Sequence, residues 1–215
     1  MKKVILMLAV SITCLASQFV VAQNTTPQIR TNNIYGEIGF GTGKTIIANE
    51  TKSHLKVALG GSFDPVFAGN LSTAFYYAPL NWKGLGIGTR LMWSGGPGAV
   101  GENGDDYFFN YYNFSASAKY YALSQTFNKG LYLRLSLGTG QLTTKRANDT
   151  LNSFTHQFAI GNTITGNIGY SFPIGKGAVS IEGHFETSSR SGTINGLGDK
   201  NLRSGQIGAN IIFSF

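Results

Sequence analysis

The last eleven residues of the chain, Gly205 to Phe215, restrict its fold more than any other stretch. They read GQIGANIIFSF, so apolar residues alternate with polar or small ones. A period of two places the two sets on opposite faces of a β-strand. An edge strand of a soluble sheet is one interpretation. The other interpretation is a strand of a closed membrane barrel, which pairs on both sides and turns its apolar face to lipid. The aromatic residue at the end of the strand fits this second interpretation better. The apolar set is Ile207, Ala209, Ile211, Phe213 and Phe215.

The same alternation recurs along the chain and predicts eight strands. Three short connections, 79–83, 123–129 and 173–177, alternate with polar stretches at 44–53, 95–105, 143–153 and 189–204. One alternative concerns Leu55 to Phe63, which keep the parity of the residues after Asp64-Pro65. We interpret the two segments as one long, bulged strand, whereas a hairpin at Asp64-Pro65 would raise the count to ten. The predicted strands cover about 34–43, 55–77, 84–94, 106–122, 131–137, 154–172, 179–186 and 205–215.

Composition supports a barrel over a helical membrane protein. Charged residues make up only 13% of the chain, and aromatic residues also make up 13%. Beyond the N-terminus, no segment has the 18 consecutive apolar residues that a spanning helix needs, and the pattern predicts no helix. The sequence therefore predicts an all-β protein, an eight-stranded antiparallel up-and-down transmembrane β-barrel. Its short turns would lie in the periplasm and its long loops outside the cell.

The N-terminus has the pattern of a secretory signal peptide. Lys2 and Lys3 precede an apolar run from Val4 to Val21, and Val20-Val21-Ala22 offers small residues at the usual cleavage spacing. A permanent membrane anchor is the alternative, but polar residues interrupt the run. We expect a signal peptide at 1–22 and a single barrel domain at 23–215. The only cysteine, Cys14, falls within the leader, so the mature chain would have no thiol chemistry.

The two faces of the predicted strands differ in chemistry. One face carries Leu, Ile and Phe, with Trp93, Tyr112, Tyr120 and Tyr170 towards strand ends, as in the aromatic girdles of membrane barrels. The other face is rich in Gly, Ser, Asn and Thr. We expect the apolar face to meet lipid and the polar face to line a plugged interior with a charge network. Its predicted members are Glu37, Arg90, Lys119, Arg134, Glu182, His184 and Glu186.

The heights of four of these residues predict one shared layer. Glu37, Arg90, Arg134 and Glu182 lie at similar distances from the short-turn end of strands that run in the same direction. Their side chains should therefore meet across the interior, where buried charges need partners.

The leader, the eight alternating strands, the short–long rhythm of the connections and the terminal Phe215 resemble the small eight-stranded outer-membrane barrels. This is the class of the OmpA transmembrane domain, OmpX and the opacity proteins. The resemblance implies residence in the outer membrane of a Gram-negative bacterium, in contact with lipid and lipopolysaccharide. It also implies that Ile211, Phe213 and Phe215 act as an assembly signal for the barrel-assembly machinery. Unlike in OmpA, we expect no peptidoglycan-binding domain after the barrel.

Three classes of function remain open: a structural or surface-interaction barrel, a narrow porin, and a lipid-modifying enzyme. Eight strands enclose an interior that side chains just fill, which counts against the porin. The resemblance to lipid A deacylase barrels would call for a His-x-Ser pattern. Here Phe185 and Glu186 follow His184, so the serine position is not matched. Of the other two histidines, His54 lies beside the first long loop, and His156 lies on the apolar parity near the outer end of a predicted strand. We therefore expect a non-enzymatic barrel without cofactor or metal, whose loops meet an unidentified surface partner. The positive charges are scattered, so we expect no nucleic-acid partner.

Overall fold

The structure is a computed structural model, which describes residues 33–59, 61–63, 67–101, 106–146, 157–194 and 198–215. The predicted signal peptide at 1–22 and His156 lie outside these residues.

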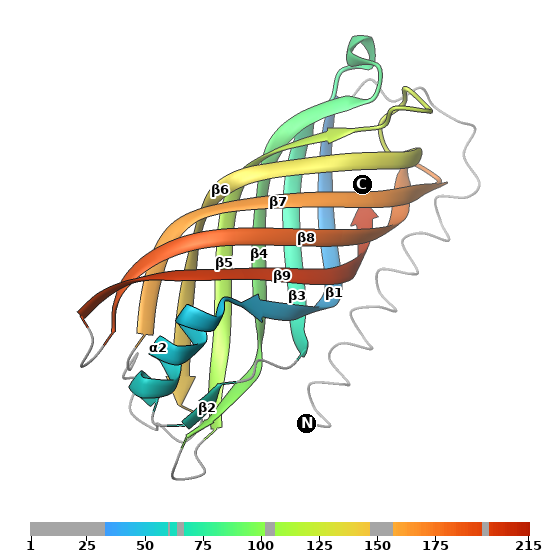
Figure 1. The fold of residues 1–215 in the computed structure, drawn as a ribbon. Coiled ribbons are helices and arrows are strands. Elements are labelled where there is room, and N and C mark those ends of the chain that lie inside the picture. The colour runs from blue at the N-terminus through green and yellow to red at the C-terminus, as the bar shows by residue number, and fades with distance from the viewer. Residues whose placement is uncertain (1–32, 60, 64–66, 102–105, 147–156, 195–197) are drawn as a thin grey trace, which may run out of the picture.

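Eight antiparallel strands form a closed barrel, as the sequence predicts (Figure 1). Each strand pairs with its neighbour in the chain, and β9 pairs back onto β1 to close the wall. The last strand therefore has partners on both edges, as its alternation predicts. The barrel strands are β1 (Ile34–Ile47), β3 (Phe67–Tyr77), β4 (Leu85–Gly101), β5 (Asp106–Tyr120), β6 (Gly130–Arg146), β7 (Gln157–Ile174), β8 (Gly177–Ile194) and β9 (Gly198–Ser214).

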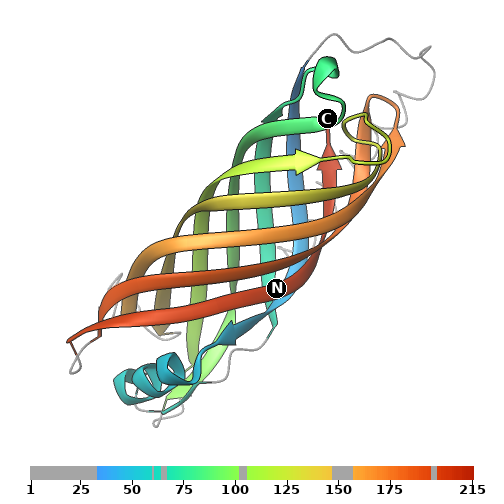
Figure 2. The ribbon, with the colours of Figure 1, turned by 45° about the horizontal axis from the view of Figure 1, so that its top comes forward.

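The strands are strongly staggered around the barrel, which tilts them relative to its axis (Figure 2). Starting at Ile168 of β7 and passing from partner to partner, the register returns to β7 at Phe158. The shift is ten residues (168 minus 158). Strand number, stagger and tilt together fix the width of a barrel. Eight strands leave an interior that side chains can fill.

Between β1 and β3 the sequence interpretation was wrong. Leu55 and Leu59 belong to a helix, α2 (Asn49–Leu59), and not to a long bulged strand. A three-residue strand, β2 (Gly61–Phe63), follows and pairs with the outer end of β4. Asp64 and Pro65 lie outside the described residues. The alternation of Leu55, Val57 and Leu59 suggested a strand, but apolar residues four apart also share one face of a helix.

Helix α2 lies beside the outer part of β9, where neither β1 nor β3 continues the wall. β1 stops pairing with β9 at Ile47, and β3 begins only at Phe67, whereas β8 and β9 continue further outward. The Thr51 hydroxyl accepts a hydrogen bond of 2.9 Å from the Arg203 amide of β9. In this way α2 caps part of the exposed edge of β9 (Figure 1).

Strands continue into three of the predicted loops. β4 continues through Gly101, β6 through Arg146, and β8 and β9 extend to Ile194 and from Gly198. The predicted loop at 189–204 is therefore mostly a hairpin of two long strands. The apolar period disappears there because the outward residues are polar, as Ser189, Ser191 and Asn201 are. Backbone pairing does not require an apolar face, so the strands continue beyond it.

The three short connections lie at one end of the barrel, as predicted. A 3-10 turn, η2 (Leu80–Trp82), joins β3 to β4, and Lys83 and Gly84 have positive φ angles of 49° and 86°. The β7–β8 turn is tighter, with φ of 57° at Gly175. None of the helices in the described part of the chain has both the length and the apolar character needed to cross a membrane.

Candidate functional site: the barrel interior

The seven residues predicted for the charge network all point into the barrel and are buried. Strand alternation is the reason: each has outward neighbours such as Ile38, Leu91 or Phe185 on either side along its strand. The structure divides the seven among three layers along the barrel axis. It also adds an aromatic layer at the turn end that the sequence did not suggest. The described interior is therefore stacked in levels.

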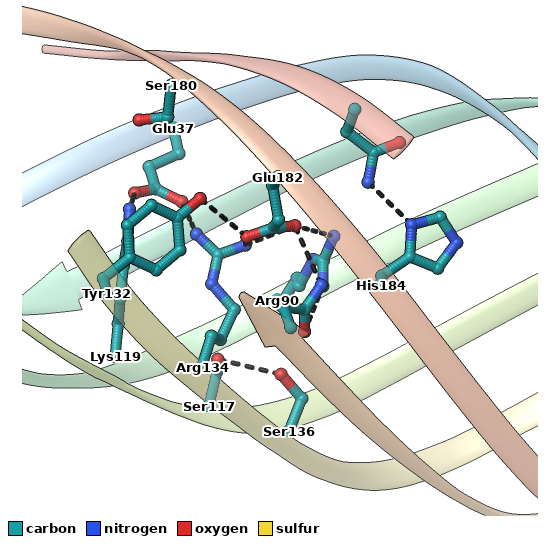
Figure 3. Close-up of polar contacts among 12 residues, drawn as sticks. Glu37, Arg90, Ser117, Lys119, Tyr132, Arg134, Ser136, Ser180, Glu182 and His184 are labelled. Atoms are coloured by element: carbon teal, nitrogen blue, oxygen red, sulfur yellow. Dashed lines mark hydrogen bonds and ion pairs between the residues drawn. The ribbon is translucent and has the colours of Figure 1, made fainter. Parts of the chain in front are cut away.

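The inner ionic layer joins five charged side chains from five strands (Figure 3). Glu37 of β1 binds the Lys119 ammonium at 2.6 Å and also pairs with Arg134. Glu182 of β8 lies 3.1 Å from Nη1 of Arg134 and 3.2 Å from Nη2 of Arg90. Arg134 thus bridges the two carboxylates. The structure brings together the four residues placed at one height by sequence, with Lys119 as a fifth.

Neutral donors complete the partners of Glu182. The Tyr132 hydroxyl donates to one of its oxygens at 2.9 Å, and the Asn167 amide donates to the other at 2.8 Å. Asn167 also accepts a hydrogen bond from Arg90. A buried charge is tolerated only when it is paired and hydrogen-bonded, and Glu182 is both. The layer holds three cations and two carboxylates, so the carboxylates are the scarce partners.

An aromatic layer closes the interior at the turn end. Phe127, from the β5–β6 turn, packs among Tyr35, Tyr76 and Tyr121 with ring centroids 4.7, 5.7 and 5.2 Å away. A Cβ at Gly86 would collide with the Phe127 ring, so a residue without a side chain is needed there. The turn therefore folds into the barrel and not away from it.

Polar and cationic groups join this aromatic layer to the ionic layer above it. The Lys119 ammonium lies 4.0 Å from the centroid of the Tyr132 ring, a cation–π contact. The Tyr121 hydroxyl is 2.8 Å from that of Ser171, which is 2.7 Å from that of Ser180. Burial raises the pKa of the Tyr121 phenol, so its hydroxyl keeps the proton at neutral pH.

An amide layer surrounds His184 on the outer side of the ionic layer. Its ring nitrogens lie 3.2 Å from the Gln206 and Asn210 side chains. Gln206 also donates to Asn70 and Ser94, at 3.2 and 2.6 Å. Both nitrogens of His184 are therefore engaged by neutral amides, and neither contacts Glu182 or Glu186. Among the described residues, no group of three or more His, Cys, Asp or Glu side chains could hold a metal ion.

The outer ionic layer is centred on Arg190, which the sequence reading missed. Its guanidinium lies 3.3 Å from Glu186, 3.0 Å from the Asn113 carbonyl oxygen and 2.8 Å from Ser204. Asn113 in turn donates to Glu186 at 2.5 Å. Sequence reading placed Arg190 in a loop. The available signal was parity, since Arg190 continues the even-numbered inward series of Glu182, His184 and Glu186.

A glycine makes room for this second layer. A Cβ at Gly140 of β6 would collide with Asn113 and crowd the Arg190 guanidinium. The guanidinium also lies 4.7 Å from the centroid of the Tyr111 ring. Unlike the inner layer, the outer layer holds equal numbers of cations and carboxylates, one of each, on the same strand.

The three residues of the predicted assembly signal lie on the outward parity of β9. Ile211 and Phe215 are exposed and Phe213 is half-buried. The backbone of Phe215 exchanges two hydrogen bonds of 3.0 Å with Gly36, and its ring covers that glycine, where a Cβ would collide with it. The terminal residue therefore completes the seam between β9 and β1.

No family model and no curated protein matches the chain. Among solved structures, it is similar to the attachment invasion locus protein Ail of Yersinia pestis, with 13% identity, a TM-score of 0.45, and coverage of 86% of this chain and 100% of that one. It is also similar to Neisserial surface protein A, with 14% identity, a TM-score of 0.47, and coverage of 84% and 96%.

A third similar structure is the N-terminal β-barrel domain of Pseudomonas aeruginosa OprF. Here the identity is 12%, the TM-score 0.39, and the coverage 86% of this chain and 98% of that one. Because these identities do not exceed 14% and the TM-scores stay below 0.5, the barrel assignment rests on the strand pairing and on none of these likenesses.

Proposed function

We propose that this protein is an integral outer-membrane β-barrel with a closed interior, and that it acts through the parts of its wall and loops outside the membrane. The observation that carries the proposal is the distribution of polarity. The wall buries three glutamates, three arginines and Lys119, whereas large apolar side chains are exposed on the outside. Water would favour the opposite arrangement, and lipid favours this one. Exposed examples are Phe40, Phe75, Leu91, Phe114, Leu135, Ile164, Ile181 and Ile211.

The height of this apolar belt fits a bilayer. On β9 the outward apolar residues extend from Phe215 to Ile207, and Arg203 and Asn201 follow on the same face. Nine residues of strand at a tilt of about 45° cover roughly 20 Å, close to the apolar band of about 25 Å on outer-membrane barrels. On β8 the belt ends at Phe185, and Thr187 and Ser189 follow. We take this boundary as the outer membrane surface.

The wall beyond the belt supports a surface role. Outward polar side chains bond one another there: Ser191 with Asn201 at 2.9 Å and Thr193 with Asp199 at 2.6 Å. Together with α2, these strand ends form an ordered polar rim with a partly uncapped edge at the start of β9. We propose that this rim meets lipopolysaccharide headgroups or a surface partner, while the barrel below anchors it.

The stacked layers in the interior favour a plugged barrel over the porin. The Phe127 ring, the bridged carboxylates of Glu37 and Glu182, and the Arg190 cluster occupy three levels, and the amide layer around His184 lies between the two ionic ones. For His184, a structural role fits its two amide partners better than the proton transfer of a lipid-modifying enzyme. We therefore propose no catalysis and no cofactor.

Two measurements test this proposal together. Refolded into lipid vesicles, the protein should become protease-resistant and migrate differently on gels when heated and unheated. In planar bilayers it should give no steady conductance. Large, long-lived single-channel steps from the pure protein would instead support the porin. Failure to insert into vesicles would contradict the membrane assignment altogether.

The assembly signal is tested in cells. Because Phe215 closes the seam onto Gly36, deleting it should reduce the folded protein in the outer membrane several-fold, with Thr193→Ala as a matched control at the opposite end. Assembly of the deletion variant at wild-type level would remove Phe215 from the proposed signal.

A further inference from the structure

The end of the barrel that carries the short turns has a charge pattern of its own. Each of its three turns exposes one lysine: Lys83 between β3 and β4, Lys129 between β5 and β6, and Lys176 between β7 and β8. The turns contain no acidic residue, and no ion pair joins any of these lysines to another described residue. The backbone of Phe215 lies at the same rim, where it pairs with Gly36.

Exposed apolar side chains accompany two of the three lysines, Lys83 and Lys129, in the same turns. Leu80 is 67% exposed and Leu123 is 78% exposed, although both lie outside the strands. Trp82 is also exposed and packs against Tyr77 at 5.5 Å, edge to face. In water such residues would be costly to expose. At a membrane interface, aromatic rings and lysines with apolar stems are stabilised, since one part meets hydrocarbon and the other meets headgroups.

The opposite end of the barrel lacks this uniform sign. Its described surface carries Glu50 and Asp199 together with lysines, and Asp199 is hydrogen-bonded to Thr193. The turn end is thus the part of the described surface where cations stand without carboxylates and continue directly from the apolar belt. That combination fits an anionic headgroup attached to hydrocarbon chains.

We propose that the turn-end rim, formed by Lys83, Lys129, Lys176 and the apolar residues of their turns, is a docking surface for anionic phospholipid headgroups. The inference rests on the proposed function, because it takes the belt to lie in a bilayer. Each lysine would hold a lipid phosphate at the level where the belt ends, and Leu80, Trp82 and Leu123 would contact the first carbons of the chains. A lysine at an anionic surface gives about fivefold local enrichment at low ionic strength.

The two tryptophans of the chain make a direct test possible. Trp82 lies at the turn end and Trp93 towards the other. In a Trp93→Phe variant, fluorescence reports only the turn end. That variant is inserted into vesicles containing brominated phosphatidylglycerol, or brominated phosphatidylcholine at the same mole fraction. We expect phosphatidylglycerol to quench Trp82 more strongly, as about fivefold local enrichment would require, and salt to reduce the difference.

The Trp93→Phe variant, in which Trp82 is the only tryptophan, also serves to test the lysines. The two lipids should quench it equally once it also carries Lys83→Gln, Lys129→Gln and Lys176→Gln. A matched control replaces Lys44, Lys52 and Lys56, which lie towards the other end, and should keep the preference. Equal quenching with the turn lysines intact would overturn the inference, as would a preference that survives their removal. Failure of the Trp82-only variant to insert into either type of vesicle would contradict the proposed function instead.

Discussion

The inner and outer ionic layers hold the same kinds of side chain but are built differently. The inner layer draws its five charges from five strands, and Arg134 bridges Glu37 and Glu182 across the interior. The outer layer is one pair, Arg190 with Glu186, four residues apart on β8. The inner layer can form only when the barrel is closed, whereas the outer pair is already close along one strand. We infer that the ion pairs of the inner layer stabilise the closed barrel strongly, and that the ion pair of the outer layer stabilises it weakly.

The largest expected effect is that of Glu182→Gln. The change removes one of two carboxylates that serve three cations and leaves Arg90 without its charged partner. Removing one partner of a buried ion pair typically costs about 3–5 kcal/mol, and interior water would reduce that figure. Urea unfolding in lipid vesicles measures the loss. A change below about 1 kcal/mol, the size of a single neutral hydrogen bond, would show that the inner layer does not stabilise the closed barrel.

Lys119→Met should have a smaller effect at the same layer. It leaves two cations for two carboxylates, and Glu37 keeps Arg134 as a partner. We expect a loss of about 2 kcal/mol, nearer to that of a hydrogen bond with a charged group than to that of an orphaned charge. The comparison with Glu182→Gln uses the same unfolding measurement. If Lys119→Met lowers the free energy of unfolding more than Glu182→Gln does, the excess of cations over carboxylates does not explain the contribution of the carboxylates to stability.

A double-mutant cycle tests whether Arg134 and Glu182 act as a unit. The two lie 3.1 Å apart, so Arg134→Met and Glu182→Gln together should destabilise less than the sum of the single changes. Coupling between contacting residues lies within about 0.5–3 kcal/mol, and we expect about 1–2 kcal/mol here. Arg134→Met with Glu186→Gln, in the other layer, is the control pair. If the losses for Arg134 and Glu182 are additive, the ion pair between them does not contribute to the stability of the barrel.

Sequence alternation predicted the strand number, the inward residues and the common height of Glu37, Arg90, Arg134 and Glu182. It could do so because the period of two depends only on local backbone geometry. The ion pairs themselves depend on which strands face each other across the interior, which the closed register decides. Lys119 shows this, since it reaches Glu37 from a strand of the opposite direction.

The sequence interpretation was wrong where the outward face no longer carries an apolar pattern. Beyond the belt the outward residues are polar, so the strand that carries Arg190 was interpreted as a loop. At α2, only three apolar residues alternate. Because they lie at odd-numbered positions, as the apolar residues of the next strand do, they were interpreted as part of that strand. In one place the wall continues through backbone pairing, and in the other it is capped by contacts such as the hydrogen bond from the Arg203 amide to the Thr51 hydroxyl. Neither leaves a hydrophobic period to detect.

The smallest expected effect is that of Glu186→Gln in the outer layer. Glutamine keeps the size of the side chain, and Arg190 retains the hydroxyls of Ser188 and Ser204 and the carbonyl oxygen of Asn113 as acceptors. The guanidinium therefore keeps several hydrogen bonds when its carboxylate is lost, whereas Arg90 would keep one in the inner layer, to the Asn167 carbonyl oxygen. We expect a loss of about 1 kcal/mol, that of one hydrogen bond, in the same urea unfolding measurement. Gly140→Ala, which crowds Asn113 and Arg190 without changing charge, separates packing from electrostatics. If Glu186→Gln instead destabilised the barrel as much as Glu182→Gln does, the pair on a single strand would matter as much as the bridge across the interior, and the contrast between the two layers would fail.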